Sequence, residues 1–304
     1  MENTRDRYPT RTQEALRMFP RLDPVVHTDE DRRWDGPLGE AEVEAFERDG
    51  FLFFPGFFGA DEVAEFREEL RRLEQEPSLR DWDGMVREPG SEEVRSVFAI
   101  HRPSISERLA RLARDRRLLD RVQQLLASPT YIHQSRINYK PGFKGKGFNW
   151  HSDFETWHAE DGMPFMRAIS CSIVLTDNHE FNGPLMLVPG SHRWFVPTVG
   201  ETPEDNYRSS LKDQQVGVPD GDSLAALIRE GGIEAAKGPA GSLLMFECNT
   251  LHASNANLSP DPRSNVFFVY NSVRNRPSGP FSAPKERPDF LAERSDFTAL
   301  EPAD

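Results

Sequence analysis

The apolar and polar positions divide the chain into a mainly helical first part and a strand-rich second part. Apolar residues at Val63, Phe66, Leu70 and Leu73 follow the three-to-four spacing of one helical face, which predicts an amphipathic helix over residues 61–76. The other elements expected in this part are helices over 39–48 and over 105–127, the latter broken near Asp115, and strands over 51–54 and 92–100.

From Tyr131 onward the pattern changes, because residues 131–140 alternate between apolar and polar types, the period of a strand. The further strands expected are 166–176, 184–188, 242–248 and 264–273. Many strands separated by Gly, Pro and Asn turns favour a sandwich or a barrel. The polar stretch 197–237 has one short helical pattern around 224–229, and it is either a lid or an inserted surface loop.

The length of 304 residues suits one large β-rich domain with helical additions. One domain is preferred to two because no linker rich in Pro, Gly and Ser divides the chain. We expect residues 1–37, which are charged and proline-containing without periodicity, to form an extended or partly disordered N-terminal arm. Residues 38–295 would then form the single domain, and residues 296–304 a tail.

The charge and the cysteine content restrict the partners and the compartment. A net charge of −13 argues against nucleic acid or an anionic membrane as a partner. Cys171 and Cys248 lie in apolar, strand-like segments, which gives no disulfide framework and fits a reduced cytosol. The chain shows neither an apolar signal core near its start nor an apolar run of about 20 residues, so we expect a cytoplasmic protein.

The candidate chemistry begins in residues 148–164, which combine aromatic residues with two histidines and four carboxylates. In a strand, the side chains of residues i and i+2 point to the same face, so His151 and Asp153 are expected to project together. One imidazole and one carboxylate are two thirds of the facial triad that holds non-haem Fe(II). Alone, a His-x-Asp match is weak, because a core histidine near a capping aspartate gives the same pattern.

Two downstream residues complete the pattern. His252 follows an apolar strand and can supply the third metal ligand, and Arg263 opens the next β-rich run. A metal-bound 2-oxoacid leaves a distal carboxylate, which a bidentate arginine suits. Of the other histidines, His158 is expected in the surroundings of the site or at the surface, and His192 in a strand-ending turn.

Residues 148–164 resemble the signature segment of the ectoine hydroxylases, a branch of the phytanoyl-CoA-dioxygenase-like Fe(II)/2-oxoglutarate oxygenases. The similarity covers roughly residues 50–290. The resemblance implies a double-stranded β-helix, the jelly-roll core of the cupins, in a mainly β protein with flanking helices. It also implies hydroxylation of ectoine to 5-hydroxyectoine in a stress response, with Fe(II) as the cofactor and 2-oxoglutarate and O2 as cosubstrates. Succinate and CO2 would be released, and the protein would be a homodimer.

The same resemblance assigns the site residues. It implies a metal site of His151, Asp153 and His252, and places 2-oxoglutarate at Lys140 and Arg263. Ectoine is a small cyclic amidinium carboxylate, so its pocket needs aromatic faces for the cation and donors for the carboxylate. The substrate-binding candidates are Gln134, Thr156, Trp157, Phe246, Phe267 and Arg287, the last from a C-terminal segment that could fold over the pocket.

Two other functions fit parts of the pattern. A sister hydroxylase acting on another small solute or amino acid would keep the triad and change the aromatic residues. A non-catalytic jelly-roll binding protein would bind no iron and form no succinate. A halogenase is disfavoured because Asp153 occupies the position that a halide would need.

Overall fold

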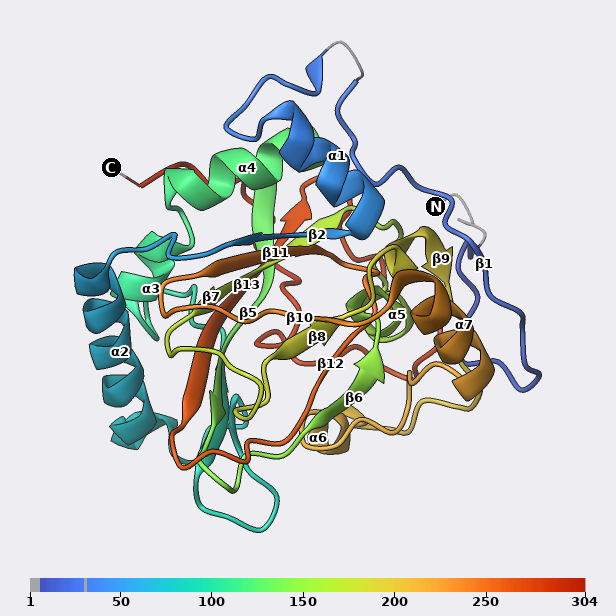
Figure 1. Ribbon diagram of the computed structural model, residues 1–304. Helices are drawn as coiled ribbons and strands as arrows, with labels where there is room; N and C mark the ends of the chain where they lie inside the picture. The colour runs from blue at the N-terminus through green and yellow to red at the C-terminus, as the bar shows by residue number, and fades with distance from the viewer. Residues whose placement is uncertain (1–5, 30–31, 304) are drawn as a thin grey trace.

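Two antiparallel β-sheets face each other at the centre of the computed structural model, which describes residues 6–29 and 32–303 (Figure 1). The strand order is β2-β11-β7-β13-β5-β4-β3 in the large sheet and β10-β8-β12-β6 in the small one. The large sheet contains β2 (Phe51–Phe54), β3 (Met85–Arg87), β4 (Val94–Phe98), β5 (Thr130–Lys140), β7 (Ala168–Val174), β11 (Leu243–Glu247) and β13 (Arg263–Ser272). The small sheet contains β6 (Phe148–His151), β8 (Leu185–Leu187), β10 (Glu234–Ala235) and β12 (His252–Ser254).

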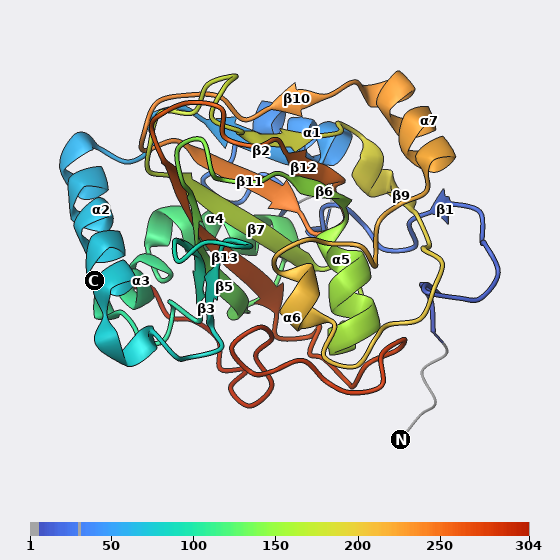
Figure 2. The same ribbon diagram turned by 90° about the horizontal axis from the view of Figure 1, so that it is seen from below.

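This pair of sheets confirms the expected jelly-roll fold class. In Figure 2, β6 and β12 of the small sheet lie above β5, β7 and β13 of the large sheet. Leu185 and Leu187 of β8 share a buried apolar cluster with Phe246 of β11 and Phe267 of β13. The inner faces of the two sheets are therefore packed against each other, as in a β-sandwich.

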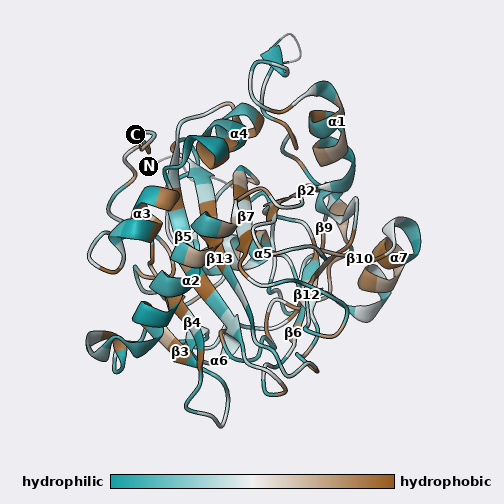
Figure 3. Ribbon diagram, turned by 60° about the vertical axis from the view of Figure 1, so that its left-hand side comes forward, coloured by the Kyte–Doolittle hydropathy of each residue, from teal (hydrophilic) through white to brown (hydrophobic). Residues whose placement is uncertain are grey.

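Four helices cover the outer face of the large sheet: α1 (Glu40–Asp49), α2 (Ala60–Gln75), α3 (Glu107–Leu112) and α4 (Arg116–Leu126). Leu73 of α2 and Leu119 of α4 belong to the same buried cluster as Phe268 of β13. Figure 3 shows both hydrophilic and hydrophobic stretches along these helices, as expected for helices with one buried face. The Asp115 side chain caps α4 by accepting a hydrogen bond from the Arg117 amide, which explains the expected break there.

Side chains alternate in direction along β13 and β5, and this separates the residues of the core from the residues of the site. Val266 and Phe268 of β13 pack in the cluster under the helices, whereas Arg263 and Phe267, in the opposite phase, line a cavity between the sheets. Four polar residues of β5 that line cavities likewise recur at every second position: Gln134, Arg136, Asn138 and Lys140. Because every second side chain of a strand points to the same face, these strands place polar side chains inside the sandwich.

Residues 6–29, the longer described part of the N-terminal arm, are extended but packed against the domain. Its short strand β1 (Phe19–Pro20) pairs with β9 (Trp194–Phe195). Tyr8 is fully buried, with its ring centroid 5.1 Å from that of Phe154. Buried residues such as Tyr8 and Thr10 attach this segment to the side of the sandwich. Residues 1–5 and 30–31 of the expected arm lie outside the described residues.

The remaining helical segments lie near one end of the sandwich. These are α5 (Asp153–Thr156), the π-helical turn Trp157–Asp161, α6 (Tyr207–Ser210) and α7 (Gly221–Gly231), apart from two short 3-10 helices over Pro77–Leu79 and Ser191–Arg193. Helix α7 is longer than the expected 224–229, because Asp220 caps it through the amides of Asp222 and Ser223. Among the described residues, no helix is long and apolar enough to cross a membrane.

Candidate active site

His151, Asp153 and His252 converge at the end of the small sheet. His151 is the last residue of β6 and His252 the first of β12, and they are register partners in this antiparallel pair. The Asp153 carboxylate lies 3.6 Å from His151 Nε2 and 3.8 Å from His252 Nε2. One ligand atom from each of the three lies within 4.8 Å of the others, a spacing that a single metal ion could bridge.

The local structure around Asp153 differs from the expected strand. The strand ends at His151, and Ser152 caps α5 with its hydroxyl oxygen accepting a hydrogen bond from the Glu155 amide. Asp153 is therefore the first helical residue, and the strand-to-helix turn, not the pleat of a strand, brings it beside His151. The Phe154 amide donates to the Cys248 carbonyl over 2.8 Å, which fixes this turn against the end of β11.

The hydrogen bonds of the two imidazoles leave the same nitrogen of each free to bind a metal. His151 Nδ1 lies 2.8 Å from the Asn149 carbonyl oxygen, and His252 Nδ1 lies 3.0 Å from that of Thr250. A carbonyl only accepts, so Nδ1 carries the proton in both rings and Nε2 presents its lone pair toward Asp153.

The electrostatics also suit a metal. Burial and the neighbouring His151 lower the pKa of His252 to about 4, so its imidazole is neutral at pH 7. Burial raises the pKa of Asp153, but His252 and His151 outweigh it and hold this pKa well below its usual range. Metal binding requires a neutral imidazole and an ionised carboxylate. Two histidines and one carboxylate with open positions are the donor set of non-haem Fe(II) oxygenases, so these residues fit that metal.

A cavity of about 50 Å³ extends from His151 and His252 to two cationic side chains, Lys140 and Arg263. Nε and Nη1 of Arg263 are buried without a hydrogen-bond partner, and burial lowers its pKa to about 10. A buried guanidinium without an anion is costly, and a carboxylate would satisfy it by a charge-assisted pair of hydrogen bonds. The cavity therefore has a metal site at one end and an unsatisfied anion site at the other.

Lys140 lies directly across the strand pair from Arg263, as its register partner on β5. Its ammonium donates to Ser254 Oγ over 2.9 Å and to the Asn255 carbonyl over 2.5 Å. Burial and the charge of Arg263 lower the pKa of Lys140 to about 6. A bound dicarboxylate would favour the charged form of both side chains, so the geometry suits 2-oxoglutarate.

A second cavity, of about 40 Å³, adjoins the first at Arg136, Phe148 and His151. Four predicted substrate-binding residues line it together with Asp153: Gln134, Thr156, Trp157 and Arg287. Thr156 Oγ1 is buried without a hydrogen-bond partner, and Trp157 is 2 % exposed. The structure thus brings these four residues to one pocket beside the metal ligands.

Arg287 reaches the second cavity but is already engaged by a carboxylate. Its Nε and Nη2 donate to the two oxygens of Asp161 over 2.8 and 2.5 Å. Burial raises the pKa of Asp161, but Arg287 and His133 hold it well below its usual range. Arg287 thus brings the C-terminal segment to the pocket, and Asp161 holds its guanidinium there.

The two predicted phenylalanines lie in different places. Phe267 lines the first cavity, where the guanidinium of Arg136 stacks 5.1 Å from its ring centroid. Phe246 is buried, with its ring 5.0 Å from that of His252, and lines neither cavity in the described part of the chain. Phe246 therefore supports a metal ligand, and the structure does not bring it to the substrate pocket.

Several lining residues are absent from the sequence-based candidates. Arg136 lines both cavities, and Asn138 and Ser254 line the first. Glu160 and Asn206 line the second, and Asn206 comes from the stretch 197–237, which forms part of the pocket wall. The period of two along β5 could have revealed Arg136 and Asn138, because they are in phase with Gln134 and Lys140.

Two histidines considered as alternatives lie away from the metal ligands. His158 is fully buried and does not lie at the surface: its Nε2 is 2.8 Å from Asp6 Oδ1, and its ring stacks on Phe281 with centroids 4.1 Å apart. His192 is also buried, with Nε2 3.2 Å from the Glu47 carbonyl oxygen. These hydrogen bonds give both histidines a structural role.

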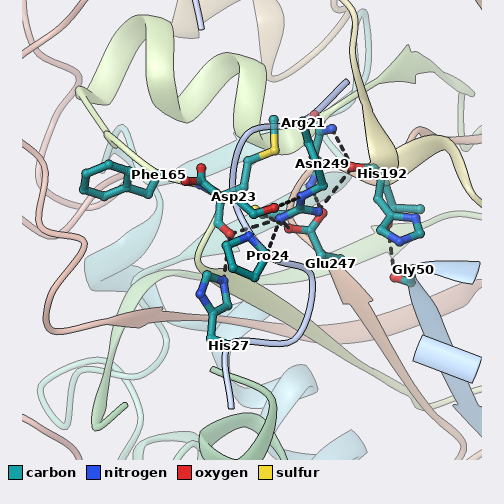
Figure 4. A network of polar contacts seen from close by, with 12 residues as sticks. Arg21, Asp23, Pro24, His27, Gly50, Phe165, His192, Glu247 and Asn249 are labelled. Atoms are coloured by element: carbon teal, nitrogen blue, oxygen red, sulfur yellow. Dashed lines mark hydrogen bonds and ion pairs between the residues drawn. The ribbon is translucent and has the colours of Figure 1, made fainter. Parts of the chain in front are cut away.

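A buried polar network joins the N-terminal arm to residues that neighbour the metal ligands in sequence (Figure 4). Arg21 of the N-terminal arm donates to Glu247 over 3.2 Å, and Glu247 accepts the Asn249 amide over 2.7 Å. Asn249 Oδ1 in turn accepts the hydroxyl of Ser152, the residue between two of the ligands, over 2.9 Å. The network connects the arm to both ligand-bearing segments, and such supporting hydrogen bonds orient metal ligands.

Comparisons with known proteins agree with this geometry. A family model described as phytanoyl-CoA dioxygenase matches residues 46–265. The ectoine dioxygenase of Halomonas elongata is 57% identical over 293 residues, covering 96% of this chain and 87% of the relative. The crystal structure of EctD from S. alaskensis with 2-oxoglutarate and 5-hydroxyectoine has a TM-score of 0.87 and 46% identity, covering 98% of each chain. The structure of that protein with bound Fe has a TM-score of 0.86 and 47% identity, with the same coverage.

The match to the family model spans most of the chain, and the identity to a curated relative extends over nearly all of it. The resemblance inferred from residues 148–164 is thereby confirmed. The chain belongs to the phytanoyl-CoA dioxygenase family.

Proposed function

We propose that this protein is an ectoine dioxygenase, which hydroxylates ectoine to 5-hydroxyectoine with Fe(II), 2-oxoglutarate and O2 and releases succinate and CO2. The observation that carries the proposal is the position of His151, Asp153 and His252 beside a cavity that ends at the unpaired guanidinium of Arg263. Relatives named ectoine dioxygenase at 57% and 51% identity over nearly the whole chain support the choice of substrate.

When bound, Fe(II) and 2-oxoglutarate supply the oxidation, in which the cosubstrate loses CO2 and one oxygen atom of O2 enters succinate and the other the substrate. His151, Asp153 and His252 would hold the metal. Arg263 would hold the distal carboxylate of 2-oxoglutarate, with Lys140 as a second cation close by. The task of these residues is to bind and orient, because correct placement of reacting groups accounts for much of the rate in such a site.

The second cavity is the proposed ectoine pocket. The face of Trp157 suits the delocalised cation of ectoine, and the Thr156 hydroxyl, which is buried without a partner, is available to the substrate. Gln134 is anchored by its Nε2, which donates to the Leu291 carbonyl over 2.7 Å, so its side chain is fixed in the wall. The Asp153 side chain is only 14% exposed, so the site also limits the access of water.

An anaerobic titration tests the proposed chemistry. Adding Fe(II) and 2-oxoglutarate to the protein without O2 should produce the visible metal-to-ligand charge-transfer band of a chelated 2-oxoacid. His252→Ala is the matched control, since it removes one ligand from the same cavity and should abolish the band. A wild-type protein that produces no band and no succinate would instead be the non-catalytic binding protein considered as an alternative.

A substrate test separates ectoine from the second alternative, a hydroxylase of another small solute or amino acid. The loaded enzyme would be given ectoine or proline, each with O2, and the products separated by chromatography. We expect hydroxylation of ectoine and little of proline, because proline offers a secondary ammonium in place of the delocalised amidinium that Trp157 would recognise. Faster hydroxylation of proline would contradict the proposed substrate.

We also propose that the protein is a cytoplasmic homodimer, as the family resemblance implies. Three large apolar side chains, Phe143, Phe181 and Leu258, are 70%, 64% and 72% exposed. Their loops are adjacent, since the Leu258 amide donates to the Phe181 carbonyl over 2.8 Å, and a partner subunit would cover such a patch. Light scattering during size-exclusion chromatography should give twice the chain mass for the wild type and a monomer for Leu258→Ser. A monomeric wild type would contradict the dimer.

A further inference from the structure

Arg11 of the N-terminal arm is a fully buried cation that contacts Glu155 of α5 and Glu160, a residue that lines the second cavity. Its side chain is 0% exposed. Nε and Nη2 each donate to a different oxygen of Glu155 over 3.0 Å, and Nη1 donates to Glu160 Oε1 over 2.6 Å. The arm also packs against α5, the helix that carries Glu155, through Tyr8, whose ring centroid lies 5.1 Å from that of Phe154.

These two carboxylates belong to the segment 153–161, which begins with the metal ligand Asp153. Glu155 lies in α5, two residues after the metal ligand Asp153, and Glu160 lies in the following π-helical turn and lines the second cavity. The predicted substrate-binding residues Thr156 and Trp157 lie between them. A π-helical turn is a rare conformation, and here a single guanidinium joins it to the preceding helix α5.

Neutral side chains also donate hydrogen bonds to the two carboxylates. Glu155 Oε1 also accepts the hydroxyls of Thr10 over 2.8 Å and Thr198 over 2.9 Å, and Glu160 Oε1 accepts Asn206 Nδ2 over 2.8 Å. None of these neutral partners carries a compensating charge. Arg11 itself has a φ of 55°, in the left-handed region that a residue with a side chain rarely adopts. The arm therefore takes a strained backbone conformation where it delivers this cation.

We propose that Arg11 is a positioning residue of the substrate pocket, which holds the turn 153–161 so that Thr156 and Trp157 face the substrate. This inference rests on the proposed function. Arg11 acts through Glu155 and Glu160 and does not line the second cavity itself among the described residues. Without it, two buried carboxylates of like charge would remain within one short turn, and the turn would open to hydrate them.

The test compares Arg11→Gln with two further arm variants. Arg11→Lys keeps the charge but loses the bidentate contact, and Arg7→Gln makes the same chemical change at an arginine of the arm that is 37% exposed and pairs with Asp23. Three quantities are measured on the full chain: the affinities for ectoine and 2-oxoglutarate of the anaerobic Fe(II)-loaded protein, the ratio of succinate to hydroxylated product, and amide hydrogen exchange in peptides covering residues 152–163.

For Arg11→Gln we expect roughly tenfold weaker ectoine binding, an affinity for 2-oxoglutarate close to that of the wild type, excess succinate over product, and faster exchange confined to residues 152–163. Arg11→Lys should recover part of each effect, and Arg7→Gln should match the wild type. Wild-type ectoine affinity and a one-to-one product ratio in a folded Arg11→Gln variant would overturn the proposal. Equal losses for both ligands, with faster exchange throughout the chain, would also overturn it.

A milder variant decides the question if Arg11→Gln does not fold. Thr198→Val removes one hydrogen bond to Glu155 and leaves the charges in place, so it should change the same three quantities in the same direction but less. No change in any of them would count against the proposal. The exchange measurement needs no ectoine, so it tests Arg11 even if the wild type proves to act on another substrate, an outcome that contradicts only the proposed function.

Discussion

His151 and His252 are register partners on the adjacent strands β6 and β12, and their ring centroids lie 4.2 Å apart. The pairing explains how a ligand from the second half of the chain reaches the His-x-Asp segment of the first. Because both histidines donate Nδ1 to the backbone carbonyl two residues earlier, both present Nε2 to the same point. The metal site is therefore preformed by the small sheet, and it does not depend on a flexible loop for its second imidazole.

The first prediction concerns the metal ligands themselves. Asp153→Ala and His252→Ala should each lose Fe(II) binding and turnover, while the fold remains, because each removes one ligand from a preformed sandwich. Circular dichroism would report the fold, and anaerobic Fe(II) titration the metal. Full activity in either variant with iron still bound would contradict the assignment of the triad.

Arg263→Lys is expected to weaken 2-oxoglutarate binding about 10- to 100-fold, since it retains the charge but loses a charge-assisted contact of roughly 1.5–3 kcal/mol. Ectoine binding should change little, because Arg263 lines the first cavity and not the second. Both affinities can be measured by calorimetry on the anaerobic Fe(II)-loaded protein. A loss of ectoine affinity alone would place Arg263 in the substrate pocket and leave Lys140 as the cosubstrate anchor.

Trp157→Ala should uncouple the reaction. An indole face contributes roughly 1–2 kcal/mol to a desolvated cation, so ectoine binding should weaken about five- to thirtyfold. Iron and 2-oxoglutarate binding should be unaffected, and succinate should form faster than 5-hydroxyectoine because the substrate is no longer held in place. If the variant keeps wild-type ectoine affinity and equal amounts of the two products, Trp157 is an ordinary core residue.

The binding of 2-oxoglutarate should depend on pH through Lys140. Burial, Arg263 and Arg95 lower the pKa of Lys140 to about 6, whereas Glu88 opposes them weakly. A bound dicarboxylate favours the protonated lysine, so binding above pH 6 should take up a proton, and the affinity should fall by up to about tenfold per pH unit as the pH rises. Calorimetry at pH 6.5 and 8 in buffers of different ionisation enthalpy would measure this. A Lys140→Met variant with the same pH dependence would contradict it.

Much of the fold follows from local pattern. The apolar spacing over 61–76 corresponds to α2 (Ala60–Gln75), and the alternation from Tyr131 corresponds to β5 (Thr130–Lys140). The positions of the arm and of the π-helical turn could not be predicted, because neither has a period of its own. Both are fixed by partners distant in sequence, as Arg11 and Glu155 show with a separation of 144 residues.

The site was predictable to the extent that motif residues lie on regular strands. The comparisons confirm the expected 2-oxoglutarate-dependent dioxygenase, and the structure brings His252 to His151 and Asp153. Phe246 lies behind His252 because its position on the inner face of β11 packs against β8, a relation that the sequence of one strand does not contain. Arg136 lines both cavities, and the only sign of this in the sequence is that it alternates in step with Gln134 and Lys140 along β5.

The stoichiometry of the wild-type reaction tests the proposed function most directly. Purified protein would be supplied with Fe(II), 2-oxoglutarate, O2 and ectoine, and succinate and 5-hydroxyectoine would be quantified in the same sample. We expect both products in a one-to-one ratio, with no 5-hydroxyectoine when 2-oxoglutarate is omitted or His252 is replaced by alanine. Succinate formation that does not respond to ectoine, with no 5-hydroxyectoine in the sample, would show that the oxygenase acts on another substrate and would contradict the proposed function.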